Sequence, residues 1–207
     1  MGTAHQSVSV SIGTRLMPNY RRAYVPGGTF FLTIVTYQRR PILESVERVS
    51  NLRAALRQVM CETPFRVLGA VVLPDHVHFI WSLPRGDTDY SRRIGRLKVI
   101  FTRSSRDERG SPTHVSDSRR KHRESDVWQR RFWKHTVNSE EEFEQVLHYI
   151  HYNAVKHGLV PCPHLWSFSS FGKWVRAGLY SIDWGCSFED RNPILPTSVN
   201  DGVWAGE

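Results

Sequence analysis

Two histidines separated by one residue, His76 and His78, begin the apolar run HVHFIWSL. Residues two apart on a β-strand point to the same face of a sheet, so both imidazoles are expected to project together. Val77, Phe79 and Trp81 then occupy the opposite face and supply the apolar packing. Neutral imidazoles ligate divalent cations without first losing a proton. A metal site and an ordinary pair of buried histidines both remain open at this point.

A second group of polar residues follows an apolar stripe near residue 150. Tyr149, Asn153 and Lys156 are spaced so that they share one face of a helix. A phenol is a nucleophile when activated, an amide oxygen is a hard metal ligand, and an ammonium contacts phosphate. The alternative is an amphipathic helix whose tyrosine ring is merely half-buried. Tyr152 points about 300° round the helix from Tyr149 and cannot replace it.

Alternating strand and helix signals must position these residues. Aromatic and β-branched runs predict strands, 3.6-residue periodicity predicts helices, and Pro74 with Asp75 makes a hairpin turn. Strands are predicted at residues 29–37, 65–73, 76–83 and 131–138, and helices at residues 45–62, 89–103 and 139–156. This β-α-β-β-α-β-α order predicts an α+β fold, with helices on one face of a mainly antiparallel sheet, as in ferredoxin-like proteins.

The chain divides into one domain and two flanking segments. Residues 1–19 are rich in Ser, Thr and Gly and are expected to be mobile. Residues 20–160 are expected to form one folded domain that carries both groups of polar residues, and within it the polar stretch 104–126 is predicted to be a flexible insert. Residues 161–207 form an aromatic tail that is expected to pack on the domain.

The composition favours a polyanionic partner. Lys and Arg number 28 against 20 Asp and Glu, which gives a formal net charge of +8. Such a surface attracts nucleic acid. The three cysteines are odd in number and lack a CxxC spacing, so no disulfide framework is expected. No signal peptide or membrane-spanning run is recognised, and we expect a cytoplasmic protein associated with the nucleoid.

Several cations are candidates for binding phosphate, although each is equally well explained as a solvated surface charge. Those flanking the predicted strands and helices are Arg21, Arg22, Arg39, Arg40, Arg92, Arg93, Arg96, Lys98, Arg130, Arg131 and Lys156. Contacts of this kind make affinity fall as salt rises.

Several motifs together resemble one family. The strand VVLPDHVHFIW is followed by the helix YIHYNAVKHGLV, and YRRAYVPGGTFFLTIVTYQRR, WQRRFWKH and WSFSSFGKWVRAGLYSIDW accompany them in order. The pattern resembles the REP-associated tyrosine transposases of the HUH superfamily. The resemblance covers roughly residues 20–185.

The resemblance implies a metal-dependent endonuclease and strand transferase that acts on single-stranded REP-type DNA hairpins. It makes Tyr149 the nucleophile, through a 5′-phosphotyrosine intermediate. It makes His76, His78 and Asn153 the ligands of Mg²⁺ or Mn²⁺, and it suggests a monomer. This chain has Ala154 where the family usually has proline, and alanine lets the helix run on. It also has Asp75 where the family often has Asn or Glu.

Three other functions are compatible with parts of the sequence. A DNA-binding protein that has lost cleavage would keep the basic segments, but here His76, His78 and Tyr149 are all intact. A zinc hydrolase would need a further histidine or an acidic base in register, and no HExxH motif is present. A plain interaction module would show no metal dependence.

Overall fold

The protein is described by a computed structural model, which covers residues 28–107 and 126–187. The segment 1–19, the cations Arg21 and Arg22, residues 108–125 of the predicted insert and the tail beyond residue 187 lie outside the described residues.

The core of the fold is a four-stranded antiparallel sheet in the order β2-β3-β1-β4. The strands are β1 (Thr29–Val35), β2 (Arg66–Val72), β3 (His76–Ser82) and β4 (Trp133–Thr136). All three neighbouring pairs run antiparallel. Every residue of β1 and β3 is buried, as expected of central strands covered on both faces. The predicted α+β class and all four predicted strands are confirmed.

Four helices lie within the described residues, and two of them begin at a serine cap. They are α1 (Val46–Glu62), α2 (Tyr90–Asp107), α4 (Glu140–Lys156) and α5 (Phe171–Arg176), with short 3-10 turns η2 (Tyr37–Arg39) and η3 (Pro163–Leu165). The hydroxyls of Ser45 and Ser139 accept the N–H of Arg48 and Glu142, so each satisfies a free amide of the first turn. Helix α2 runs on through residues 104–107, where a flexible insert was predicted, because Ser105 is buried and its carbonyl accepts from Arg48.

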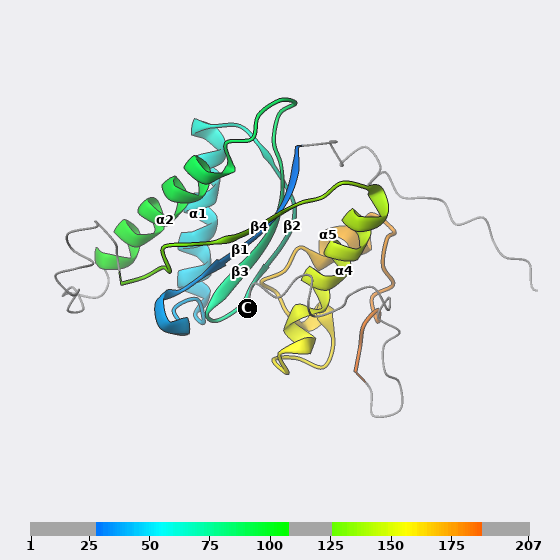
Figure 1. Ribbon diagram of the computed structural model, residues 1–207. Helices are drawn as coiled ribbons and strands as arrows, with labels where there is room; N and C mark the ends of the chain where they lie inside the picture. The colour runs from blue at the N-terminus through cyan, green and yellow to red at the C-terminus, as the bar shows by residue number, and fades with distance from the viewer. Residues whose placement is uncertain (1–27, 108–125, 188–207) are drawn as a thin grey trace, which may run out of the picture.

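Helices cover both faces of the sheet, whereas the sequence predicts them on one. Helices α1 and α2 pack on the face that carries Leu32, Val77 and Trp81. Helices α4 and α5 pack on the opposite face, with Phe31 and Ile80 (Figure 1). The predicted arrangement, with all helices on one face, therefore describes α1 and α2 but not α4 and α5. Both faces of β1 are apolar, and an apolar face exposed to water is costly, so a second layer is needed.

A glycine lets α4 approach the sheet closely. A Cβ on Gly69 of β2 would lie 2.9 Å from Leu147 Cδ1 and 3.1 Å from Ile80 Cδ1. Leu147 belongs to α4 and Ile80 to the central strand, so a side chain at position 69 would force the ends of these two side chains to shift between helix and sheet. The position of α4 matters because it carries Tyr149 and Asn153.

The described part of the tail lies along the free edge of β2. The main chain of Phe168 and Ser170 hydrogen-bonds to Val72 and Ala70, and the indole N–H groups of Trp166 and Trp174 donate to carbonyls of the same strand. An uncovered edge strand is a site of unwanted pairing, so this segment protects β2.

A disulfide joins two parts of the tail, contrary to the sequence-based expectation. Cys162 and Cys186 are bonded, while Cys61 is free and exposed. Their separation of 24 residues carries no spacing signal, and only the folded path of the tail brings them together. No helix among the residues seen in the structure is long and apolar enough to cross a membrane.

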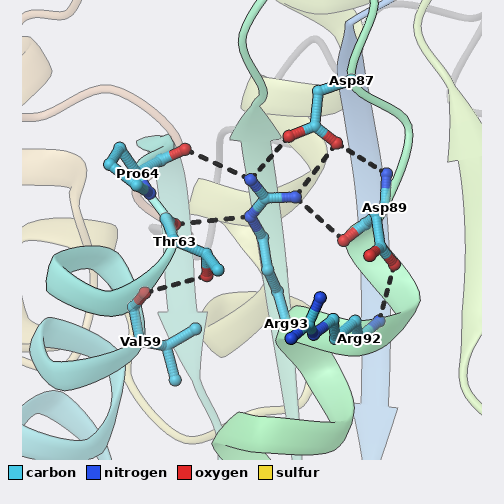
Figure 2. Close-up of polar contacts among 7 residues, drawn as sticks. All are labelled: Val59, Thr63, Pro64, Asp87, Asp89, Arg92 and Arg93. Carbon is cyan, nitrogen blue, oxygen red and sulfur yellow. Dashed lines mark hydrogen bonds and ion pairs between the residues drawn. The ribbon is translucent and has the colours of Figure 1, made fainter.

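Arg93 is a structural residue rather than a DNA contact, which corrects the expectation from its charge. Its side chain is 6% exposed and its guanidinium forms two hydrogen bonds to Asp87, at 2.7 and 3.1 Å. It also donates to the carbonyls of Thr63, Pro64 and Asp89 (Figure 2). These bonds join the end of α1 to the start of α2 and leave no donor for a phosphate.

Replacing Arg93 by Ala is expected to lower the free energy of unfolding by about 2–4 kcal/mol, because three main-chain carbonyls and one carboxylate lose the Arg93 donors. Arg92→Ala is the matched control: Arg92 is exposed on the next position of α2, and its loss is expected to change stability by less than about 0.5 kcal/mol. Urea unfolding measures both. Equal effects of the two variants would show that Arg93 does not hold the helices together.

Candidate active site

The two imidazoles lie side by side on the central strand. His76 is 1% exposed and His78 is fully buried, and their ring centroids are 4.8 Å apart. Both rings point toward α4, because His78 contacts the Tyr149 ring at 5.4 Å and His76 contacts the His157 ring at 5.3 Å. The strand alternation inferred from the sequence therefore places them as expected.

Each imidazole is oriented by a hydrogen bond at Nδ1. His76 Nδ1 lies 2.6 Å from Asp75 Oδ1, and His78 Nδ1 lies 2.9 Å from Thr33 Oγ1 on β1. Burial raises the pKa of the Asp75 carboxyl, but the hydrogen bonds and charges of His76 and Arg39 outweigh burial and bring the pKa down to about 2. A carboxylate only accepts, so His76 Nδ1 donates to Asp75, and Nε2 is the nitrogen left to face a metal.

Thr33 is a functional residue that sequence reasoning missed. It faces His78 across the β1–β3 pairing and is fully buried. The pairing register of two strands separated by a helix is not visible in a single sequence, so no local signal marks Thr33 as the partner of a histidine.

Tyr149 projects from α4 onto the imidazole face of the sheet. It is 3% exposed, and its ring packs edge-on against Phe31 at 5.8 Å and against His78. The Lys156 ammonium lies 5.3 Å from the centroid of the same ring. At this distance the ammonium makes a favourable cation–π contact with the phenol ring.

Asn153 lies on the turn of α4 between two contacts with the histidine strand. Tyr149 meets His78 and His157 meets His76, and residues four apart share a helix face. Asn153 is fully buried, and neither its amide oxygen nor its amide nitrogen has a hydrogen-bond partner among the described residues. A buried amide without hydrogen-bond partners lowers the stability of the fold by about 1–3 kcal/mol. A ligand bound to the amide of Asn153 would offset this loss.

These residues fit a divalent cation. Two imidazoles and an amide oxygen are a donor set that Mg²⁺, Mn²⁺ and similar ions accept. The alanine at position 154 does not disturb the set, because α4 continues unbroken to Lys156 and Ala154 is buried in the core. The side chain of Asn153 therefore stays on the face that carries Tyr149.

The comparison with known proteins assigns the family. Residues 25–153 match the family model described as transposase IS200 like. The chain belongs to this family. A REP-associated tyrosine transposase of Escherichia coli K12 is 37% identical over 174 residues, which cover 84% of this chain and 94% of the relative. A Haemophilus influenzae protein of the same group is 40% identical over 169 residues, covering 82% of this chain and 94% of the relative.

A solved structure agrees with the sequence relatives. It is described as a REP-associated tyrosine transposase bound to a REP hairpin, and it matches with a TM-score of 0.65 and 35% identity, over 86% of this chain and 96% of the other. The prediction of a tyrosine transposase, and hence of an enzyme, is confirmed. Enzymes of this family depend on a metal.

A buried histidine fastens the tyrosine helix of this transposase to its tail. His151 Nε2 lies 2.8 Å from Ser170 Oγ and Nδ1 lies 3.2 Å from the Tyr180 hydroxyl. Burial, together with the nearby charges of His148 and Lys173, lowers the pKa of His151 to about 3, so the ring is neutral. Sequence reasoning missed this residue, because a histidine among apolar helix positions does not reveal its partners.

The predicted DNA-binding cations of the transposase fall into two groups. Lys98 supports the fold as Arg93 does: it donates to the carbonyls of Gln129 and Arg130, and burial lowers its pKa to about 8. The structure therefore corrects the expectation for Arg93, whereas a DNA contact of Lys98 stays a prediction. Six others make salt bridges or are exposed: Arg39 pairs with Asp75, Arg40 with Asp126 and Arg96 with Glu62, and Arg92, Arg130 and Arg131 are exposed on the surface.

Proposed function

We propose that this transposase acts as a monomer on single-stranded DNA hairpins of its own nucleoid, and that Tyr149 cuts the strand beside the hairpin. The observation that carries the proposal is the contact between the Tyr149 ring and His78, next to the partnerless amide of Asn153. The hairpin as substrate class rests on the structural relative that holds a REP hairpin.

His76, His78 and Asn153 would hold the divalent cation. When bound, it would neutralise charge on a phosphate oxygen and orient the phosphorus for displacement. Hard oxygen donors suit Mg²⁺ and imidazoles favour Mn²⁺, so both ions are expected to support activity, with Mn²⁺ the stronger. Asp75 and Thr33 hold the two rings in the orientation that this role requires.

Tyr149 supplies the nucleophile. Its phenol loses a proton, the oxygen forms a bond to phosphorus, and the bond from phosphorus to the 3′ oxygen breaks, so that oxygen leaves as a 3′-hydroxyl after taking up a proton. The Lys156 ammonium favours the phenolate. The product is a 5′-phosphotyrosine. Because the ester bond is conserved in this link, a 3′-hydroxyl of another strand can reverse the step and join the strands.

Exposed and partly exposed cations are proposed to hold the DNA backbone. They are Arg39, Arg40, Arg92, Arg96, Arg130, Arg131 and Lys156, while Arg21 and Arg22 lie outside the described residues and are proposed, from the family resemblance, to read the bases at the foot of the hairpin.

Loss of Arg130 and Arg131 together is expected to weaken hairpin binding and flatten its salt dependence. Each phosphate contact removed lowers the slope of log affinity against log salt by roughly 0.7 to 0.9. Arg57→Ala, an exposed change on α1 outside this set, is the control and should leave the slope unchanged. Fluorescence anisotropy of a labelled hairpin at several salt concentrations measures this slope. A slope that the double variant leaves unaltered would remove these two residues from the DNA interface.

Cleavage itself tests the function. The purified chain is incubated with a labelled single-stranded hairpin that carries flanking sequence, with chelator, Mg²⁺ or Mn²⁺, and resolved on a denaturing gel. A shorter DNA and a covalent protein–DNA adduct are expected only with metal. Tight binding without any cleavage under every metal would favour a DNA-binding protein that has lost catalysis.

A further inference from the structure

A second group of metal-binding side chains lies away from the imidazole pair. Cys162, His164 and Cys186 place their ligand atoms all within 4.8 Å of one another. The two sulfurs are buried and joined as a disulfide, and His164 is exposed. Cys162 and His164 follow the tyrosine helix, whereas Cys186 comes from the last described turn of the tail. None of the three takes part in the chemistry of Tyr149.

The arrangement is built by the local backbone. The 3-10 turn η3 follows directly on Cys162, its N-cap residue, and brings His164 back beside it, with the N–H of Leu165 donating to the carbonyl of Cys162 at 3.1 Å. On the other side, Ser187 N–H donates to the Pro161 carbonyl at 2.7 Å. Cys186 is thereby held against the residues that open η3.

A glycine makes the close approach of the tail to η3 and α4 feasible. Gly185 has a φ of 68°, and a Cβ there would lie 3.2 Å from Pro163 Cγ and 3.3 Å from Tyr152 Cδ2. Only glycine adopts this conformation in so narrow a space without strain. Tyr152 thus contacts the tail at Gly185, whereas the Tyr149 ring packs against Phe31 and His78 of the sheet.

We propose that Cys162, Cys186 and His164 form a Zn²⁺ site when the disulfide is reduced. A small thiol reductant supplies two electrons and two protons, is itself oxidised to a disulfide, and leaves two thiols. Each thiol gives up its proton as it binds the cation, and His164 binds as neutral imidazole. Two sulfurs and one nitrogen select Zn²⁺, whereas the imidazole and amide set beside Tyr149 suits harder ions. Water completes the tetrahedron on the exposed side.

The site would fasten the tail in either redox state. Trp184, two residues before Cys186, contacts the rings of His148 at 5.2 Å and Tyr180 at 4.6 Å, and Tyr180 bonds to His151 of α4. The disulfide under oxidising conditions and the bound cation under reducing conditions would therefore both hold the tail against α4.

Cobalt reports on this site without interference from the imidazole pair. The full chain is reduced with a phosphine, freed of metal and titrated with Co²⁺, whose bonds to thiolate give a near-ultraviolet charge-transfer band that imidazole and amide ligands do not give. One equivalent of Co²⁺ is expected to develop the band, and Zn²⁺ is expected to displace it. The band should vanish in Cys162→Ser and in Cys186→Ser and persist in Cys61→Ser, the matched control.

Substitution of His164 distinguishes a metal site from a pair of thiols that binds the cation without the histidine. His164→Asn changes an exposed residue, so the variant should fold with an unchanged melting temperature, and its affinity for Co²⁺ should fall roughly tenfold or more. Three results would overturn the proposal: no thiolate band in the reduced chain, an affinity that His164→Asn leaves unchanged, or equal binding by the oxidised chain.

Discussion

Tyr149→Phe is expected to abolish the covalent protein–DNA adduct and to lower strand cleavage by roughly 10⁴-fold or more, because the substitution removes the attacking oxygen. Hairpin affinity should stay within about twofold, since the ring keeps its contacts with Phe31 and His78 and its place under Lys156. The measurement is a denaturing gel of labelled hairpin with Mn²⁺, together with anisotropy for binding.

Tyr152→Phe is the matched control for this loss. Tyr152 is on the same helix but packs beside Gly185 and Trp184, and burial raises the pKa of its phenol above the usual value. Its substitution should leave the adduct and the cleavage rate essentially unchanged. An adduct that survives in Tyr149→Phe, or one that disappears in Tyr152→Phe, would assign the nucleophile to another residue.

The part of the site that follows from local periodicity was predictable. Alternation along β3 puts His76 and His78 on one face, and the spacing of Tyr149 and Asn153 puts both on one face of α4. The helix starts near residues 45 and 139 were equally predictable, and the structure shows a serine hydroxyl capping each of them. Each of these features depends on residues close together in the chain.

The features that were missed depend on tertiary pairing. Thr33 bonds to His78 only through the register of β1 with β3, and Arg93 is satisfied by carbonyls at residues 63 and 64 some thirty positions away. The positive charge of Arg93 predicted a DNA contact. Its guanidinium instead donates to several carbonyls and so joins two helices. The Cys162–Cys186 bond likewise arises only from the path of the tail.

The second layer of helices explains why the catalytic residues meet. The ferredoxin-like unit of β1 to β4 with α1 and α2 leaves the imidazole face of the sheet uncovered. Helix α4 covers that face and brings Tyr149 with it, so one packing event both buries the apolar face and completes the site. The described tail then holds α4 through His151 and covers the edge of β2.

Asn153→Leu is expected to stabilise the metal-free chain while lowering cleavage by about a hundredfold or more. The buried amide makes no hydrogen bond in the described structure, so an apolar group of similar volume removes a desolvation cost of about 1–3 kcal/mol. The same change removes an oxygen ligand, and lost metal coordination lowers activity at least as much as the loss of an outer partner does. A residue that lowers the stability of the folded chain but supports activity is typical of a functional site.

Thermal melting with chelator and with Mn²⁺ separates the two effects of Asn153→Leu. A ligand that binds only the folded state raises the melting temperature, so Mn²⁺ should stabilise the unsubstituted chain and have much less effect on the variant. In chelator the order should reverse, with the variant melting at the higher temperature. A variant that is less stable in chelator would mean that the amide has a structural partner. A variant that responds fully to Mn²⁺ would mean that the cation is held without Asn153.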